Sequence, residues 1–241
     1  MASSRRTDVN VLVVDVGGTH VKMLATGRTR RREFQSGPAL TPTLLVAGVA
    51  RRAAGWAFDR IAIGYPGAVR SDRPIAEPHN LAPGWVDFDY AKAFGRPVRM
   101  VNDAAMQALG AYRGGRLLFL GFGTGLGSAM IVDHVLVPME LAHLPYRKAT
   151  FEDYVGLRGL RKLGRKKWRA HAADVVERLV HALLPDDVVL GGGNARLLKA
   201  LPPGCRLGGN DDAFTGGFRL WDSVATRRRS LATPRKKGTR A

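Results

Sequence analysis

The sequence has a single cysteine, Cys205, among 241 residues. One thiol cannot form an internal disulfide, and it excludes a zinc or iron–sulfur site built from several cysteines. Acidic residues are also scarce: 20 Asp and Glu face 38 Lys and Arg, which gives a formal net charge of +18. Such a surplus indicates an anionic partner, such as polyphosphate, a nucleotide, a nucleic acid or an anionic surface.

Long apolar runs are missing as well. No stretch reaches the roughly 18 apolar residues that a membrane-spanning helix needs. The first ten residues lead into the apolar run Val11–Val14 without the hydrophobic segment of a signal peptide. No helix-turn-helix, zinc-finger or RNP-like pattern occurs. We therefore expect a cytoplasmic protein with no membrane partner and no specific nucleic-acid partner.

The basic residues gather in two places. Residues 227–241 contain seven basic residues and no acidic one, which predicts a disordered basic tail. The second cluster lies between Arg147 and Arg169, and two interpretations of it are open: a solvated helix face, or a docking strip for a phosphate chain. The strip would consist of Arg161, Lys162, Arg165, Lys166 and Lys167.

Apolar strands alternate with helices in two halves, and each half begins with an apolar strand and a Gly-Thr turn. This pattern predicts an α/β fold with two related lobes. We expect a flexible segment 1–8, an N-terminal lobe 9–108 and a C-terminal lobe 109–226, with a closing helix 211–221 that packs back on the first lobe. Other helices are expected at 42–58, 104–112, 151–163, 168–184 and 195–201, and a long loop at 71–97.

Two glycine-rich turns carry the clearest chemistry. Asp15-Val-Gly-Gly-Thr19 connects two predicted strands, which excludes the dinucleotide fingerprint and the P-loop, because both require a following helix. Gly121–Gly127 repeats the arrangement. Glycines let backbone N–H groups approach phosphate oxygens, so the two turns can close on one polyphosphate. Asp15 is placed to hold Mg²⁺ through water, although an ordinary hairpin with a solvated aspartate also explains the first turn.

Polar residues occur in two further patterns. Asn102 and Asp103 follow a predicted strand and open a predicted helix, where they serve as an N-cap, as a general base beside a sugar-binding amide, or as both. Glu140 and His143 lie three residues apart. Since no cysteine or nearby histidine completes a zinc site, hydrogen bonding to a polyol suits this pair. A surface or core histidine without a ligand is the alternative.

As a set, the motifs resemble the ROK family of sugar kinases and repressors, within the sugar kinase, heat-shock protein and actin superfamily. The similarity is greatest to its polyphosphate- or ATP-dependent glucokinases. It implies a two-lobed, ribonuclease H-like fold that closes on a sugar, and a homodimer. The matching segments follow the family order: Asp15–Lys22, Gly64–Gly67, Glu77–Asn80, Asn102–Ala104, Gly121–Gly127, Glu140–His143 and Leu190–Asn194.

The resemblance also implies roles for individual residues. Asp103 would take the proton of the sugar 6-hydroxyl. The sugar would meet Gly64, Pro66, Gly67, Asn80, Asn102, Asp103, Glu140 and His143. The donor phosphates would meet Asp15, Gly17, Gly18, Thr19, Lys22, Gly123, Thr124 and Gly125, and the adenosine side would consist of Gly191, Gly192, Gly193 and Asn194.

We therefore expect an Mg²⁺-dependent glucokinase that uses ATP or polyphosphate, with the choice of donor open. Many family members carry a Cys-rich zinc loop after the histidine, whereas this chain has only Cys205, so we expect no zinc. Two alternatives are a kinase for mannose, N-acetylglucosamine or fructose, and a non-catalytic, sugar-sensing regulatory protein. Gly110, Gly208 and Gly209 are candidate hinge positions.

Overall fold

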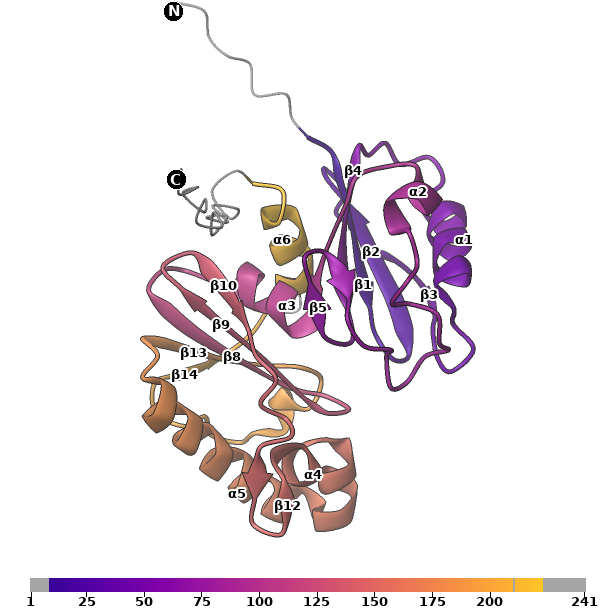
Figure 1. Cartoon of the computed structure of the whole chain (residues 1–241). Helices are drawn as coiled ribbons and strands as arrows, with labels where there is room; N and C mark the ends of the chain where they lie inside the picture. Colours follow the sequence, from indigo (N-terminus) through magenta and orange to yellow (C-terminus); the bar gives the residue numbers. More distant parts are fainter. Residues whose placement is uncertain (1–8, 210, 223–241) are drawn as a thin grey trace, which may run out of the picture.

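The computed structural model describes residues 9–209 and 211–222. The predicted terminal segments 1–8 and 227–241 lie outside the described residues. Within the described part, the strands form two five-stranded sheets and two short hairpins (Figure 1). None of the helices there is long and apolar enough to cross a membrane.

The two large sheets repeat one topology. Their strand orders are β3-β2-β1-β4-β7 and β10-β9-β8-β13-β14, and in each sheet an antiparallel meander of three strands continues into a parallel set of three. The internal repetition predicted from the sequence is therefore present as two related sheets.

The strand bounds of the first sheet are β1 (Val11–Val16), β2 (His20–Ala25), β3 (Arg32–Gln35), β4 (Arg60–Tyr65) and β7 (Val98–Asn102). Those of the second sheet are β8 (Arg116–Phe122), β9 (Leu126–Val132), β10 (Val135–Pro138), β13 (Asp187–Gly191) and β14 (Cys205–Leu207). The short hairpins are β5 (Val69–Arg70) with β6 (Arg73–Pro74), and β11 (Pro145–Tyr146) with β12 (Ala149–Thr150).

Helices cover both faces of each sheet (Figure 1). Helix α1 (Pro42–Arg52) and helix α2 (Tyr90–Phe94) pack on the outer face of the first sheet, and α4 (Phe151–Val155) and α5 (Leu157–Leu183) on the outer face of the second. Helix α3 (Asp103–Ala111) and helix α6 (Asp212–Arg219) lie between the two sheets. Central strands covered on both faces need continuous apolar runs, and Leu117–Leu120 of β8 is such a run, fully buried.

Several predicted helix bounds are wrong, and glycine or proline is usually the reason. Helix α1 ends at Arg52 rather than residue 58, just before Gly55 turns the chain with a φ of +79°. The helix predicted at 151–163 is broken by Gly156, whose ψ of 178° is extended. Gly164, with a φ of 73°, interrupts α5.

Two further expectations need correction. The helix expected at 195–201 is a single 3₁₀ turn, Ala195–Leu197, because Leu198 is already extended before the pair Pro202-Pro203. The loop expected at 71–97 contains β6 and α2. Asp89 caps α2 by accepting a hydrogen bond from the N–H of Lys92 at 3.0 Å. An aspartate before an apolar segment is a sequence signal for a helix start, but the proline-rich surroundings favoured a loop instead.

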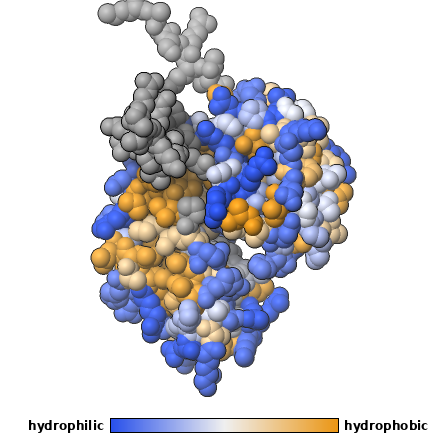
Figure 2. Space-filling view, viewed as in Figure 1, coloured by the Kyte–Doolittle hydropathy of each residue, from blue (hydrophilic) through white to orange (hydrophobic). Residues whose placement is uncertain are grey.

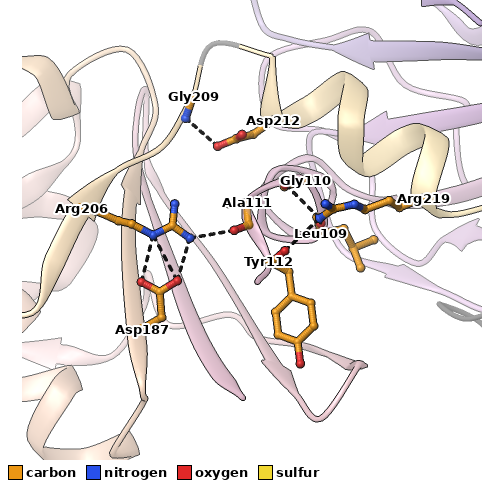
Figure 3. A network of polar contacts seen from close by, with 9 residues as sticks. All are labelled: Leu109, Gly110, Ala111, Tyr112, Asp187, Arg206, Gly209, Asp212 and Arg219. Carbon is orange, nitrogen blue, oxygen red and sulfur yellow. Dashed lines mark hydrogen bonds and ion pairs between the residues drawn. The ribbon is translucent and has the colours of Figure 1, made fainter. Parts of the chain in front are cut away.

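Two arginines hold the carboxyl end of helix α3 (Figure 3). Arg219 of α6 donates hydrogen bonds to the carbonyl oxygens of Leu109, Gly110 and Tyr112, at 2.6, 3.0 and 3.0 Å. Arg206 of β14 donates to the carbonyl of Ala111 at 2.7 Å and is ion-paired with Asp187. The last carbonyls of a helix have no partner within it, so these cations fix the far end of the helix that begins at Asp103.

Strand β10 is an edge of the second sheet and carries exposed apolar side chains. Val135 and Val137 are 55% and 40% exposed. Figure 2 shows hydrophobic residues gathered on this lobe, on the side where Figure 1 places β9 and β10.

Candidate active site

A cleft of 650 Å³ lies between the two lobes. Both halves of the sequence contribute to its lining, and most of the residues predicted to bind sugar are there. The predicted residues that line it are Gly18, Pro66, Gly67, Asn80, Asn102, Asp103, Gly123, Thr124, Gly125, Glu140, His143 and Gly192.

The parallel strands of the first sheet bring the polar residues of this lobe to one edge. Asp15 at the end of β1 pairs with Gly64 of β4, and Tyr65 of β4 pairs with Asn102 of β7. Side chains that follow parallel strands meet at the carboxyl edge of a sheet. The turns after β1, β4 and β7 therefore converge on the cleft.

Asp103 is the first residue of α3 and lines the cleft. Its Oδ1 accepts a hydrogen bond from the N–H of Ala104 at 2.8 Å. Burial is the main reason that the pKa of this carboxyl rises to about 7, and the negative charge of Asp15 raises it further. The N–H of Ala104 lowers the pKa, and the charge of Glu140 raises it. A carboxyl with a pKa near neutrality can take up and release a proton at the pH of a cell.

Asn102 acts as the N-cap of α3. Its Oδ1 accepts hydrogen bonds from the N–H groups of Ala104 and Ala105, at 2.9 and 3.3 Å, and its Nδ2 donates to the carbonyl of Gly67 at 3.1 Å. Asn102 is therefore the N-cap that the sequence predicted. The same amide connects the turn after β4 to the start of α3 through its hydrogen bond to Gly67. Asn102 also lines the cleft.

Glu140 and His143 follow β10 and reach the cleft from the second lobe. Both are exposed. Ser128 of β9 fixes the segment before them, because its Oγ donates to the carbonyl of Met139 and accepts from the N–H of Leu141, both at 3.2 Å. On the opposite wall, Asn80 lies next to Gly18, where a Cβ added to the glycine would be 3.8 Å from the Asn80 Cβ.

The first glycine turn is a tight hairpin between β1 and β2. The N–H of Gly17 donates to the carbonyl of His20 at 3.1 Å, and the hydroxyl of Ser36 donates to the carbonyl of Gly17 at 2.6 Å. Only Gly18 of this turn lines the cleft; the other predicted phosphate residues of this lobe, Asp15, Gly17, Thr19 and Lys22, are not among its lining, and neither is the predicted sugar residue Gly64.

Asp15 lies behind the cleft lining and pairs across the hairpin with Lys22. Burial raises the pKa of the Asp15 carboxyl, and the charge of Lys22 lowers it. A Cβ at Gly64 would be in ordinary van der Waals contact with the Oδ1 of Asp15, at 3.4 Å, but would overlap the side-chain end of Met106. Among the described residues, no three His, Cys, Asp or Glu side chains cluster closely enough to hold a metal ion.

The second glycine turn is fixed from three sides. Glu152 of α4 accepts a hydrogen bond from the N–H of Leu126 at 3.3 Å, and the N–H of Leu157 donates to the carbonyl of Thr124 at 3.0 Å. Asn194 donates from Nδ2 to the carbonyl of Gly123 at 3.0 Å. The turn therefore presents Gly123, Thr124 and Gly125 to the cleft in a fixed conformation.

The residues predicted for the adenosine side support this turn. The N–H of Asn194 donates to the carbonyl of Phe122 at 2.9 Å, and Gly192 has a φ of +79°. A Cβ at Gly192 would come within 2.5 Å of the Phe122 carbonyl oxygen, so glycine is required there. Of this group, Gly192 lines the cleft, whereas Gly191, Gly193 and Asn194 do not.

The predicted basic strip is divided by the break in α5. Arg161 and Lys162, together with Arg158 and Thr124, line a depression of 570 Å³ that adjoins the second glycine turn. Thr124 belongs to both the cleft and this depression. Arg165, Lys166 and Lys167 follow the interrupting Gly164; they are exposed but do not line the depression.

Sequence reasoning assigned no role to four polar residues that line the cleft, although the first two lie in the matching segment Glu77–Asn80: Glu77, His79, Gln107 and Glu152. Gln107 lies four residues after Asp103, on the same face of α3, so helical spacing could have found it. Glu152 stands in the first turn of α4, between Thr150 and Asp153, which form a capping box. Only the tertiary fold brings that turn to the cleft.

The two matched sheets around a polar cleft are the architecture of α/β proteins with the actin- and hexokinase-like fold. The sequence profile described as "ROK family" matches residues 11–138, which is more than half of the chain. The protein therefore belongs to the ROK family.

Named relatives are identical to this chain at about a quarter of the aligned residues. The polyphosphate glucokinase of Mycobacterium leprae (strain TN) is 26% identical over 207 residues, which cover 76% of this chain and 63% of that one. The chain thus spans less than two thirds of this relative. The polyphosphate glucokinase of Mycobacterium tuberculosis (strain H37Rv) is 27% identical over 206 residues, 76% of this chain and 77% of that one.

A solved structure shares the fold. The inorganic polyphosphate/ATP-glucomannokinase of Arthrobacter sp. strain KM superposes with a TM-score of 0.74 at 22% identity, covering 87% of this chain and 97% of that one. At this identity the likeness establishes the fold alone.

Proposed function

We propose that the protein is a hexose kinase that transfers a phosphoryl group from polyphosphate or ATP to the 6-hydroxyl of glucose. One observation carries this proposal: the Asp103 carboxyl, with its raised pKa, lines a cleft whose walls also contain glycine turns from both lobes. The family and its polyphosphate glucokinase relatives agree with this chemistry.

In the proposed reaction, the hexose lies against Asn80, Glu140 and His143, with its 6-hydroxyl beside Asp103. The carboxylate accepts the hydroxyl proton as the sugar oxygen bonds to the terminal phosphorus, and the bond from that phosphorus to the donor oxygen breaks. Backbone N–H groups at the glycine turns stabilise the phosphate oxygens. Phosphoryl transfer needs mainly alignment and charge stabilisation, and a cleft between two lobes supplies both.

The residues present fit Mg²⁺. This ion prefers one or two carboxylates, retained water and substrate phosphates. Asp15 supplies a half-buried carboxylate whose negative charge raises the pKa of Asp103. Asp15 would hold the ion through water, and the ion would neutralise charge on the donor phosphates. Asp103 then remains the proton acceptor, and the glycine turns fix the donor.

The depression beside Thr124 favours polyphosphate as a donor. A polyphosphate chain bound at the second glycine turn would continue over Thr124 toward Arg161 and Lys162, where cations attract it. Among the predicted adenosine residues, Asn194 is hydrogen-bonded to the carbonyls of Phe122 and Gly123 at the glycine turn. ATP remains a possible donor, since the name of the structural relative includes both donors.

A kinase with a broader choice of hexose is the second candidate, because that same relative is named a glucomannokinase. Homodimer formation, with β10 as the candidate contact, and a cytoplasmic location also stay proposals. The exposed Val135 and Val137 of this edge strand support the first of these.

A matrix of donors and acceptors tests the proposed function. Purified protein is incubated with polyphosphate or ATP and with glucose, mannose, fructose or N-acetylglucosamine, and the sugar phosphate is measured. We expect glucose 6-phosphate to form, and EDTA to stop its formation until Mg²⁺ is restored. A higher rate with another hexose would support the second candidate. Sugar binding without transfer from either donor would instead support a regulatory protein.

The two parts of the basic strip should differ in their effect on the donor. Arg161→Ala/Lys162→Ala removes two charges that line the depression, whereas Lys166→Ala/Lys167→Ala removes two exposed charges beyond Gly164. We expect the first pair to raise the KM for polyphosphate about tenfold, and the KM for ATP about threefold or less. The reason is that exposed, partly screened cations attract a long polyanion more strongly than they attract ATP.

The second pair is the matched control and should change both constants little. Steady-state kinetics with each donor at 0.1 M salt, where the Debye length is about 10 Å, provides the comparison. Equal effects of the two pairs, or of one pair on both donors, would mean that the strip is only a solvated helix face.

A further inference from the structure

The wall of the cleft between Ala76 and Val86 has almost no regular secondary structure, yet Glu77, His79, Asn80 and Leu81 of this segment all line the cleft. An irregular segment holds its shape only if its backbone groups find partners. The conformation of this wall therefore depends on the few contacts that close the loop.

A single carboxylate makes most of those contacts. Glu77 Oε2 accepts hydrogen bonds from the N–H groups of Gly84 at 3.0 Å and Trp85 at 3.1 Å, and Oε1 accepts from those of Trp85 at 3.2 Å and Val86 at 3.3 Å. Hydrogen bonds to a charged acceptor are about twice as strong as neutral ones. The side chain thus joins the two ends of the segment, and Asn80 lies between them.

Buried aromatic residues form the base of the loop. Trp85 is fully buried, and its indole N–H donates to the carbonyl of Ala82 at 2.6 Å. The hydroxyl of Tyr65 donates to the carbonyl of Ala76 at 2.9 Å, and the hydroxyl of Tyr90 donates to the carbonyl of Trp85 at 3.0 Å. The two ends of the loop are therefore anchored to the core, and the Glu77 carboxylate sets the conformation of the part between them.

We propose that Glu77 is a positioning residue for the acceptor: its carboxylate holds the 77–86 loop so that Asn80 faces the hexose. This inference rests on the proposed function, because it assigns a task within the same site. Glu77→Gln preserves the size of the side chain but replaces one acceptor oxygen with an NH₂ group, which cannot accept a hydrogen bond from a backbone N–H. The loop then loses its charged acceptor while the aromatic base remains.

The test compares Glu77→Gln with Glu33→Gln, the same change at an exposed residue of β3. We expect Glu77→Gln to raise the KM for glucose about tenfold, because a misplaced binding group weakens substrate binding. It should leave kcat and the KM for the donor within about twofold, since Asp103 and the glycine turns do not contact Glu77. Glu33→Gln should change none of the three constants.

Amide hydrogen exchange gives a second readout. In the Glu77→Gln variant, the amides of Gly84, Trp85 and Val86 should exchange faster, while amides of the sheets keep their protection. A loop that exchanges faster with an unchanged KM for glucose would overturn the positioning role, and so would a loss of kcat alone. A wild-type protein that phosphorylates no hexose would defeat the proposed function instead, so the two failures are distinguishable.

Discussion

Replacing Asp103 with Asn is expected to lower kcat by about two to four orders of magnitude, the usual contribution of a general base. The amide has the size of the carboxyl but cannot take a proton from the sugar hydroxyl. It can still accept the hydrogen bond from the N–H of Ala104 that Asp103 Oδ1 accepts in the structure. The measurement is the rate of sugar phosphate formation with saturating donor, together with the Kd for glucose, which should stay within a fewfold of the wild-type value.

Stability separates a catalytic loss from a folding defect. A carboxyl whose pKa rises from about 4 in the unfolded chain to about 7 on folding binds more protons in the folded state. Its contribution therefore favours folding at low pH and is lost as the pH rises through 7. Asn stays neutral and escapes that loss, so above pH 7 the Asp103→Asn variant should melt at the same or a higher temperature. Asp87→Asn, at an exposed position, is the control and should keep full activity.

The pH profile of the wild type follows from the same carboxyl. Only ionised Asp103 accepts a proton, so kcat/KM should fall about tenfold per pH unit below a midpoint near 7 and level off above it. Mg²⁺ at Asp15 would cancel part of the charge that raises the pKa, which places the midpoint at or below 7 when the ion is present. Retained turnover in Asp103→Asn, or a flat profile between pH 5 and 8, would contradict the role of Asp103 as the base.

Local sequence signals predicted the parts of the site that depend on neighbouring residues. The turns at Gly17–Thr19 and Gly121–Gly127 stand between apolar strands, and Asn102-Asp103 stands between a strand and a helix. Each is a strand end or a helix start, where side chains and backbone N–H groups are free to meet a ligand. The parallel strand order of the first sheet brings the Gly17–Thr19 turn and Asn102-Asp103 to one edge, whereas the Gly121–Gly127 turn reaches the cleft from the second sheet.

Contacts between distant segments could not be predicted in this way. Glu152 meets the N–H of Leu126 only because the tertiary fold brings α4 to β9. Glu77 meets N–H groups seven to nine residues further along the chain, but only through the irregular path of its own loop. Glu152 belongs to no local pattern that marks a site, and Glu77 lies in the matching segment Glu77–Asn80, where only Asn80 is assigned a role. The strand β10 was missed too, because it is only four residues long and follows a turn in which Asp133 and His134 have positive φ.

Gly110 illustrates how a local pattern can point to the wrong cause. As a glycine near a predicted junction, it is a candidate hinge. In the structure it lies inside α3, where α6 packs directly against it: a Cβ there would overlap the backbone carbonyl of Asp212. A Cβ at Gly216 of α6 would likewise overlap the carbonyl of Met106. Close approach of two helices therefore explains both glycines.

The close contact between α3 and α6 leads to the second prediction with a large expected effect, which concerns stability. Inside a helix, Gly→Ala normally stabilises a protein by about 1 kcal/mol, because alanine has the higher helix propensity. At Gly110 we expect the opposite sign. The new methyl group meets backbone rather than a flexible side chain, so α6 has to move away from α3. Beside this contact, Arg219 of α6 donates hydrogen bonds to the carbonyl oxygens at the end of α3 (Figure 3).

Gly110→Ala should therefore destabilise the protein by about 3 kcal/mol, the upper range for an overpacked core, which corresponds to a fall in Tm of about 6–12 °C for a chain of this size. Thermal unfolding followed by circular dichroism measures it. Gly193→Ala is the control, because a Cβ there has no neighbour within 4 Å, and its Tm should hardly change. A Gly110→Ala variant that melts at or above the wild-type temperature would mean that α6 does not pack on α3 this closely. Since α3 begins with Asp103, the variant should also lose activity at temperatures where the wild type is still folded, and regain it on cooling together with the circular dichroism signal.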